Sequence, residues 1–169
     1  MRFVLILVGL CMQSMGLLCQ YKTVHIGNKV WMAENLNRDI PGSYVYNGQA
    51  ELAKKYGRLY TWEAARNACP VGWHLPTAAE WDELIAALGN ENSAGKQLKA
   101  SGSSGFNALY AGYTNGQTFF FLESMGGFWS ATEYDNNHAW YYFFTNKNDA
   151  FTKTYFNKNY AFSVRCVKN

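Results

Sequence analysis

The sequence predicts an α+β fold in which two short helices precede a set of antiparallel strands. Three observations lead to this class: a hairpin pattern near the start, two capped helical segments in the middle, and an aromatic-rich second half with strand-like segments. The 169 residues are 49% hydrophobic and 17% aromatic, which is enough apolar surface for a core. We therefore expect one domain.

The first residues have the layout of a secretory signal peptide. A charged start is followed by an apolar run over residues 3–12 that is too short to span a bilayer. We expect a signal peptide over residues 1–19, cleaved after Gly16 or Cys19, and the domain over residues 20–169. A lipid anchor on Cys19 is the alternative. Either way the prediction is a secreted or cell-surface protein.

The cysteines fit this interpretation. Cys11 lies inside the leader and Cys19 at its edge, which leaves Cys69 and Cys166 as the pair expected in the exported domain. A bridge between them would close a loop of about 100 residues and stabilise the fold by ~3–5 kcal/mol. It would tie the middle of the chain to its end.

The charge balance disfavours nucleic acid as a partner. The formal net charge is +3, and removal of the leader with Arg2 leaves about +2. Lysines and arginines form no stripe, and Lys54-Lys55 reads as a solvated helix or turn face. Beyond the leader, no segment is apolar and long enough to be a membrane span.

The domain is expected to open with a β-hairpin. Thr23–Ile26 and Lys29–Met32 flank Gly27-Asn28, a two-residue turn whose members tolerate a positive φ. From Asn35 to Gly57 the sequence shows loop and short-turn signals with no sustained period. We expect irregular structure there.

Two helices follow. Thr61 can cap a short helix through Ala68, which Pro70 must end. Thr77 and Glu80 have capping-box spacing, so a second helix begins at Thr77. It carries an apolar stripe and a C-terminal glycine, namely Trp81, Leu84, Ile85, Leu88 and Gly89.

The remainder is aromatic-rich and predicts short strands. These are Leu109–Tyr113, Thr118–Leu122, Phe128–Ser130, Ala139–Thr145 and Tyr155–Val167. In the last segment apolar residues alternate with small or charged ones, so Cys166 is expected to point inward and Ser163 and Arg165 outward. This alternation supports the bridge.

Several long segments together resemble a known family, the Fibrobacter succinogenes major paralogous domain. They are YKTVHIGNKVWMAENLN at 21–37, CPVGWHLPT at 69–77, FWSATE at 128–133 and FSVRCV at 162–167. The resemblance implies a C-type-lectin-like fold, as found in exported proteins of Bacteroidota and Fibrobacter. It also implies paired terminal strands and a disulfide from the first helix to the last strand, where Cys69 and Cys166 lie.

No metal or other cofactor is expected. The resemblance to C-type lectins would imply calcium-binding triplets such as Glu-Pro-Asn and Trp-Asn-Asp, and these do not occur. The oxygen-rich residues 133–136 and 146–149 read as solvated turns. His25, His74 and His138 lack zinc-ligand spacing.

No catalytic residue is expected either. The fold implied by the resemblance is shared with formylglycine-generating enzymes, to which LPTAAEW at 75–81 is similar, but these enzymes need two closely spaced cysteines near the C-terminus. Only Cys166 is there. A nucleophile pair of Cys69 and His74 is the other enzymatic interpretation, and a disulfide beside a structural histidine fits the sequence better. We expect a protein without enzymatic activity.

The segment from Tyr134 to Tyr160 is the expected recognition surface. It mixes rigid aromatic rings with adaptable amides, a composition that suits a polysaccharide or a protein ligand. The predicted ligand-binding residues are Asn136, Asn137, Trp140, Tyr141, Asn146, Asn148, Tyr155 and Asn157, with His138, Tyr142 and Asn159 nearby. The alternative is that rings such as Trp140 and Tyr142 fill the core of a sheet.

The sequence thus predicts an exported binding module. The main rival is a structural cell-surface component without a dedicated ligand. The Asn-rich segment also resembles the variable regions of ligand binders that are diversified by a retroelement, and an enzyme of the formylglycine-generating type is a further alternative.

Overall fold

The computed structural model describes residues 21–169, so the predicted signal peptide, its cleavage after Gly16 or Cys19 and the anchor at Cys19 lie outside the described residues. The helices are η1 (Tyr46–Gly48), α1 (Ala50–Tyr56), α2 (Trp62–Arg66), α3 (Ala78–Ala87) and α4 (Ala94–Leu98). The strands are β1 (Thr23–Ile26), β2 (Lys29–Met32), β3 (Ser43–Tyr44), β4 (Leu59–Thr61), β5 (Trp73–His74), β6 (Tyr113–Thr114), β7 (Phe119–Phe120), β8 (Met125–Glu133), β9 (His138–Thr145), β10 (Thr152–Asn157), β11 (Ala161–Phe162) and β12 (Val167–Lys168).

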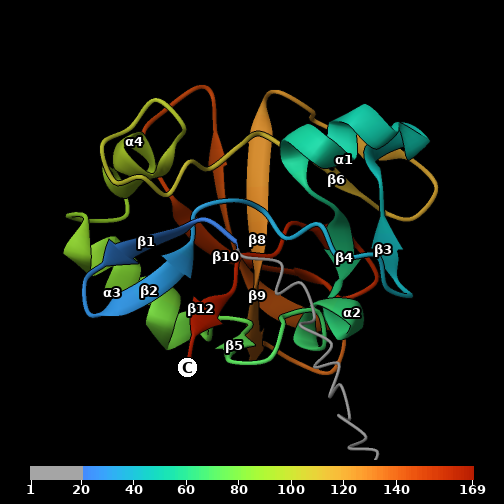
Figure 1. The fold of residues 1–169 in the computed structure, drawn as a ribbon, viewed down its shortest axis with the longest axis horizontal. Coiled ribbons are helices and arrows are strands. Elements are labelled where there is room, and N and C mark those ends of the chain that lie inside the picture. Colours follow the sequence, from blue (N-terminus) through green and yellow to red (C-terminus); the bar gives the residue numbers. More distant parts are fainter. Residues whose placement is uncertain (1–20) are drawn as a thin grey trace, which may run out of the picture.

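The described residues have the predicted α+β class, and their named strand pairs are antiparallel (Figure 1). One sheet has the order β1-β2-β12-β5, a second β10-β9-β8, and a third β3-β4-β11-β6-β7. The second sheet contains the longest strands, β8 and β9, which run through the middle of the molecule in Figure 1. It organises the core.

This central sheet is buried on both faces. Trp129 of β8 and Tyr141 of β9 are paired and lie in a core cluster with Trp62 of α2, whereas Phe128 and Tyr142 lie in a cluster on the other face. Trp81 of α3 belongs to that second cluster. Each such ring contributes about 1.5–3 kcal/mol through burial. Helices α2 and α3 thus cover opposite faces of β8 and β9.

The predicted hairpin is confirmed as β1 and β2, joined by Gly27-Asn28. Of these two turn residues only Gly27 has a positive φ, 59°, which is the pattern of a type II′ turn with glycine in the first central position. The two predicted helices are confirmed as well. The Thr61 side chain accepts a hydrogen bond from the Ala64 N–H at the start of α2, and Thr77 and Glu80 form the full capping box of α3.

Two α-helices and the short 3-10 helix η1 were not predicted. Helix α1 lies inside the segment expected to be irregular, and α4 lies in a polar stretch. Neither Gln49 before α1 nor Ser93 before α4 makes a side-chain cap, so the local signal of a helix start was missing. Tertiary burial of residues such as Tyr56 and Leu98 holds them instead.

Two strand predictions are corrected. Of Leu109–Tyr113 only Tyr113 is in a strand, because Gly112 turns the chain with a φ of 65°. The segment Tyr155–Val167 is not one alternating strand but parts of β10, β11 and β12, and residues 161–167 are all buried. Ser163 and Arg165 therefore point into the protein, not outward.

Arg165 is the extreme case, since its guanidinium is fully buried. It donates hydrogen bonds to Asn35 Oδ1 (2.7 Å) and to the carbonyls of Met32, Phe106 and Asn107, and it lies 4.4 Å from the Phe106 ring centroid. Burial lowers the pKa of Arg165 to about 9. Carbonyl oxygens and aromatic faces take the place of water around this charge.

The disulfide between Cys69 and Cys166 is present, as predicted. It links the turn after α2 to the residue before β12, and β12 pairs with β2 near the start of the described chain. Within residues 21–169, no helix combines the length and apolarity needed to cross a membrane.

Candidate ligand-binding site

The candidate site lies at one end of the sheet β10-β9-β8. The turn between β8 and β9 contains Asn136 and Asn137, and Asn157 at the end of β10 pairs with His138 at the start of β9. The β8–β9 turn and the β10–β11 turn are therefore neighbours. We call this region the sheet tip, defined by residues 133–140 and 155–160.

Asp135 shapes the β8–β9 turn. Its carboxylate accepts hydrogen bonds from the N–H groups of Asn137 and His138, both at 2.8 Å, and contacts Nδ1 of His138 at 2.8 Å. The backbone hydrogen bond from Asn137, followed by the contacts to His138, lowers the pKa of Asp135 although the group is exposed. The carboxylate of Asp135 therefore forms its hydrogen bonds within the β8–β9 turn.

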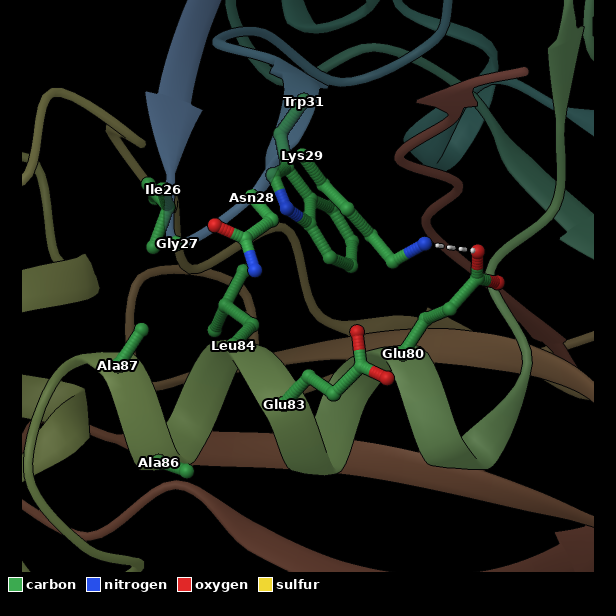
Figure 2. A pocket seen from close by; sticks show the side chains of 10 residues that line it. All are labelled: Ile26, Gly27, Asn28, Lys29, Trp31, Glu80, Glu83, Leu84, Ala86 and Ala87. Carbon is green, nitrogen blue, oxygen red and sulfur yellow. Dashed lines mark ion pairs between the residues drawn. The ribbon is translucent and has the colours of Figure 1, made fainter.

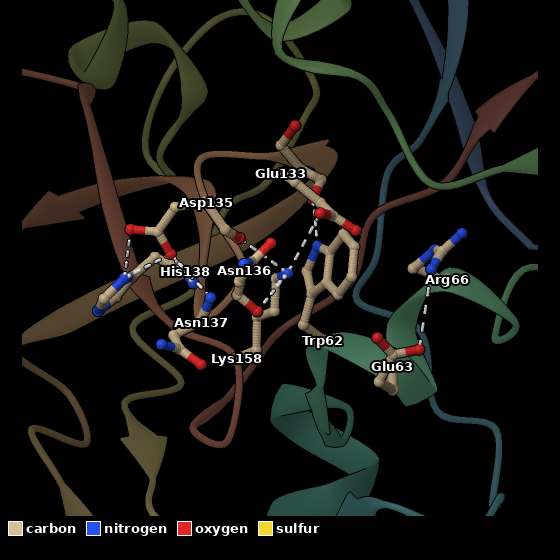
Figure 3. A network of polar contacts seen from close by, with 10 residues as sticks. Trp62, Glu63, Arg66, Glu133, Asp135, Asn136, Asn137, His138 and Lys158 are labelled. Carbon is tan, nitrogen blue, oxygen red and sulfur yellow. Dashed lines mark hydrogen bonds and ion pairs between the residues drawn. The ribbon is translucent and has the colours of Figure 1, made fainter.

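Lys158 fixes the same turn from the side of β10 (Figure 3). Its ammonium group donates to the carbonyls of Asp135 (3.0 Å) and Asn136 (3.1 Å) and lies 3.4 Å from a carboxylate oxygen of Glu133. It also lies 4.5 Å from the ring centroid of Trp62. Lys158 therefore positions the turn, and its charge is balanced locally.

A pocket of about 400 Å³ opens beside Lys158. Its lining consists of polar side chains from three segments, namely Thr61, Glu63, Asn136, Asn137, Asn157, Lys158 and Asn159. Within the described residues, the side chains of Asn136 and Asn137 have no hydrogen-bond partner, so their amides are available to a ligand. Each amide can both donate and accept.

An exposed aromatic cluster also lies at the sheet tip, although none of its rings lines the pocket. Tyr134 and Tyr155 stack with their ring centroids 4.0 Å apart, and they are 46% and 45% exposed. Trp140 meets the Tyr134 ring edge to face at 5.0 Å. Lys153, which is ion-paired with Asp82 at 2.7 Å, lies 5.1 Å from the Trp140 ring centroid. These contacts hold the rings in fixed positions.

The structure brings together five of the eight predicted ligand-binding residues. Asn136, Asn137, Trp140, Tyr155 and Asn157 all lie at the sheet tip. They share one end of the sheet because β8, β9 and β10 are antiparallel neighbours.

The other three predicted residues lie elsewhere. Tyr141 is only 4% exposed and packs on Phe162 in the core, so its ring is not available to a ligand. Asn146 and Asn148 lie in the β9–β10 turn at the opposite end of the sheet. The Asn146 amide donates to the carbonyl of Glu123, and Asn148 Oδ1 accepts from the N–H of Ala150. Asn148 thus supports its own turn, and Asn146 ties that turn to the segment before β8.

Tyr134 and Lys158 lie inside the predicted recognition segment but were not named as ligand-binding residues, and Thr61 and Glu63 lie outside that segment. The exposed Tyr134 could have been found from its position directly before a turn signal, Asp135-Asn136. Thr61 and Glu63 carried a helix signal and no binding signal, and they reach the site because α2 packs beside β8. Within residues 21–169, no group of three or more His, Cys, Asp or Glu side chains could hold a metal ion.

Comparison with known proteins gives one match. The family model of the Fibrobacter succinogenes major domain matches residues 24–168. Neither the curated proteins nor the solved structures contain a match to this chain.

Proposed function

The chain belongs to the Fibrobacter succinogenes major domain family, and from this premise we propose that it is an exported, non-enzymatic module that binds a polysaccharide at the sheet tip. The observation that carries the proposal is the pairing of an exposed aromatic stack with an amide-lined pocket at one end of one sheet. Flat rings pack on the apolar face of a sugar, and amides match its hydroxyl groups.

The rigidity of the sheet tip supports a recognition role. The backbone of the β8–β9 turn is held by Asp135 and Lys158, and the rings of Tyr134 and Trp140 by each other. A ligand therefore meets a backbone and rings that are already ordered, which limits the conformational freedom lost on binding.

The disulfide supports both export and the absence of enzymatic activity. Disulfides persist in oxidising compartments, which fits a protein that leaves the cytoplasm. Both cysteines of the described residues form this disulfide. Residues 21–169 therefore contain no free thiol for the redox chemistry of formylglycine-generating enzymes.

A C-type-lectin-like fold is part of the proposal. It is supported by the pairing of β2 near the start of the described chain with β12 at its end, and by the disulfide from the end of α2 to the start of β12. A purely structural surface component is the rival function. It would need no exposed aromatic stack.

Binding to an array of plant and microbial glycans tests the proposal. We expect at least one polysaccharide to bind. The double substitution Tyr134→Ala and Tyr155→Ala should weaken binding by about tenfold or more, since burial of one large apolar side chain contributes about 1.5–3 kcal/mol. Phe121→Ala is the matched control, because Phe121 is 57% exposed and lies outside the sheet tip.

Three results would count against this function. Equal loss in the Phe121 variant would show that any exposed ring suffices. Binding that survives the double substitution would move the site to another face. Capture of a protein with no glycan bound would make the ligand a protein.

A further inference from the structure

A second pocket contains a polar group without a partner. The indole Nε1 of Trp31 is buried and has no hydrogen-bond partner, alone among the buried side-chain nitrogen and oxygen atoms of the described residues. The other fully buried indoles, those of Trp62, Trp81 and Trp129, each donate to a backbone carbonyl. An unpaired buried donor is destabilising and rare in native proteins, so it calls for an acceptor.

Trp31 lines a pocket of about 310 Å³ between the β1–β2 turn and α3 (Figure 2). In Figure 2 the indole lies over α3, and its nitrogen is on the ring edge that faces the Asn28 side chain. Asn28 is exposed, and its side chain has no hydrogen-bond partner in residues 21–169, so it can turn aside. A ligand in the pocket then reaches Nε1.

The charges in this pocket disfavour an anionic ligand. The ammonium group of Lys29 is paired with Glu80 at 3.0 Å, and Glu80 also accepts from the Thr77 N–H. Glu83, one turn further along α3, is exposed and forms no ion pair among the described residues. The pocket is thus lined by Trp31 with its unpaired donor, by the carboxylate of Glu83, which forms no ion pair among the described residues, and by Lys29, whose charge is neutralised by Glu80.

We infer that this pocket binds a single neutral sugar residue. A hydroxyl group can accept from Trp31 Nε1 while another donates to Glu83, and Asn28 can do either. The volume is at the small end of the range for ligand pockets, roughly 300–1,000 Å³, which suits one ring and excludes a long chain. An anionic sugar is disfavoured by the carboxylate of Glu83.

This site is separate from the sheet tip. It is built by β1, β2 and α3, whereas the pocket beside the sheet tip is built by the β8–β9 turn, the end of β10 with the β10–β11 turn, and the start of α2. The inference therefore does not depend on the proposed function, and each site can fail without the other.

Nuclear magnetic resonance of the purified protein, labelled with ¹⁵N at tryptophan, tests the inference. D-glucose, D-galactose and D-xylose are titrated singly, with D-galacturonic acid as the charged comparison. The Trp31 Nε1–H signal is assigned as the one lost in Trp31→Phe or, if that variant does not fold, as the one most shifted in Asn28→Ala. We expect this signal to shift saturably with at least one neutral sugar and not with galacturonic acid.

Two variants separate the sites. Glu83→Ala should weaken this binding by about tenfold, the loss expected for one hydrogen bond to a charged group. Glu63→Ala, at a matched glutamate in the pocket beside the sheet tip, should leave it unchanged. A Trp31 signal that no neutral sugar moves, or that shows only a persistent contact with water, would overturn the inference. So would equal effects of the two variants.

Discussion

The carboxylate of Glu80 should make the stability of this protein depend on pH. Glu80 closes the capping box of α3, accepting from the Thr77 N–H at 2.8 Å, and it contacts His74 and Lys29, each at 3.0 Å. Its side chain is only 13% exposed. Burial opposes ionisation, but these hydrogen bonds outweigh it and lower the pKa of Glu80 from 4.5 to about 2.

The perturbation is Glu80→Gln, which keeps the reach-back hydrogen bond of the capping box and removes the charge. A pKa that is lower in the folded protein than in the unfolded chain stabilises the fold above the unfolded pKa, and this stability is lost as the pH falls through the folded pKa. The shift corresponds to about 3 kcal/mol of unfolding free energy at pH 7.

The assay is urea unfolding of both proteins, with the disulfide intact, from pH 7 to pH 2. We expect the difference in unfolding free energy between wild type and Glu80→Gln to be largest at pH 7, to fall to less than half by about pH 3, and to be close to zero at pH 2. Glu83→Gln on the same helix is the control and should show no such gap. A gap that stays constant from pH 7 to pH 2 would refute the electrostatic role of Glu80.

Three further predictions concern stability. Reduction of the bond between Cys69 and Cys166 should lower the unfolding free energy by ~3–5 kcal/mol in denaturant titrations, and a loss below ~1 kcal/mol would contradict its role as the main cross-link. Gly126→Ala places a methyl group 2.5 Å from ring atoms of Phe144. It should cost about 1–3 kcal/mol, and an unchanged melting temperature would contradict the packing described for β8. Thr77→Ala should cost about 1 kcal/mol in thermal unfolding through the lost cap of α3, and a neutral result would mean that tertiary packing alone holds this helix end.

The local signals in the sequence predicted the local structure well. Gly27 marks the hairpin turn, Thr77 and Glu80 mark the start of α3, and both features are present. Helix α1 had no side-chain cap and was missed, since its residues Ala53 and Tyr56 are held by tertiary burial. A pattern of a few neighbouring residues can predict caps and turns, because these depend on contacts within the same few residues. It cannot predict contacts with distant segments.

The candidate site was predicted in part for the same reason. The composition of residues 134–160 indicated recognition, and the sheet tip lies there. The sequence did not separate Trp140, at the exposed end of β9, from Tyr141, which packs on Phe162 in the core. Nor did it show that Asn146 lies at the far end of the sheet from Asn137.

The sequence by itself determined the α+β class, the family, the pairing of Cys69 with Cys166 and the hairpin at the start of the domain. Only the tertiary structure decided which rings face the solvent. Both faces of the central sheet are covered, so adjacent residues of β9 such as Tyr141 and Tyr142 are buried on opposite sides. It also decided that the Trp31 indole faces a pocket without an acceptor, since that depends on how the hairpin packs on α3. Backbone dihedral preferences and local hydrogen bonds depend on neighbouring residues and can be predicted from the sequence. Burial depends on segments that come into contact only after folding.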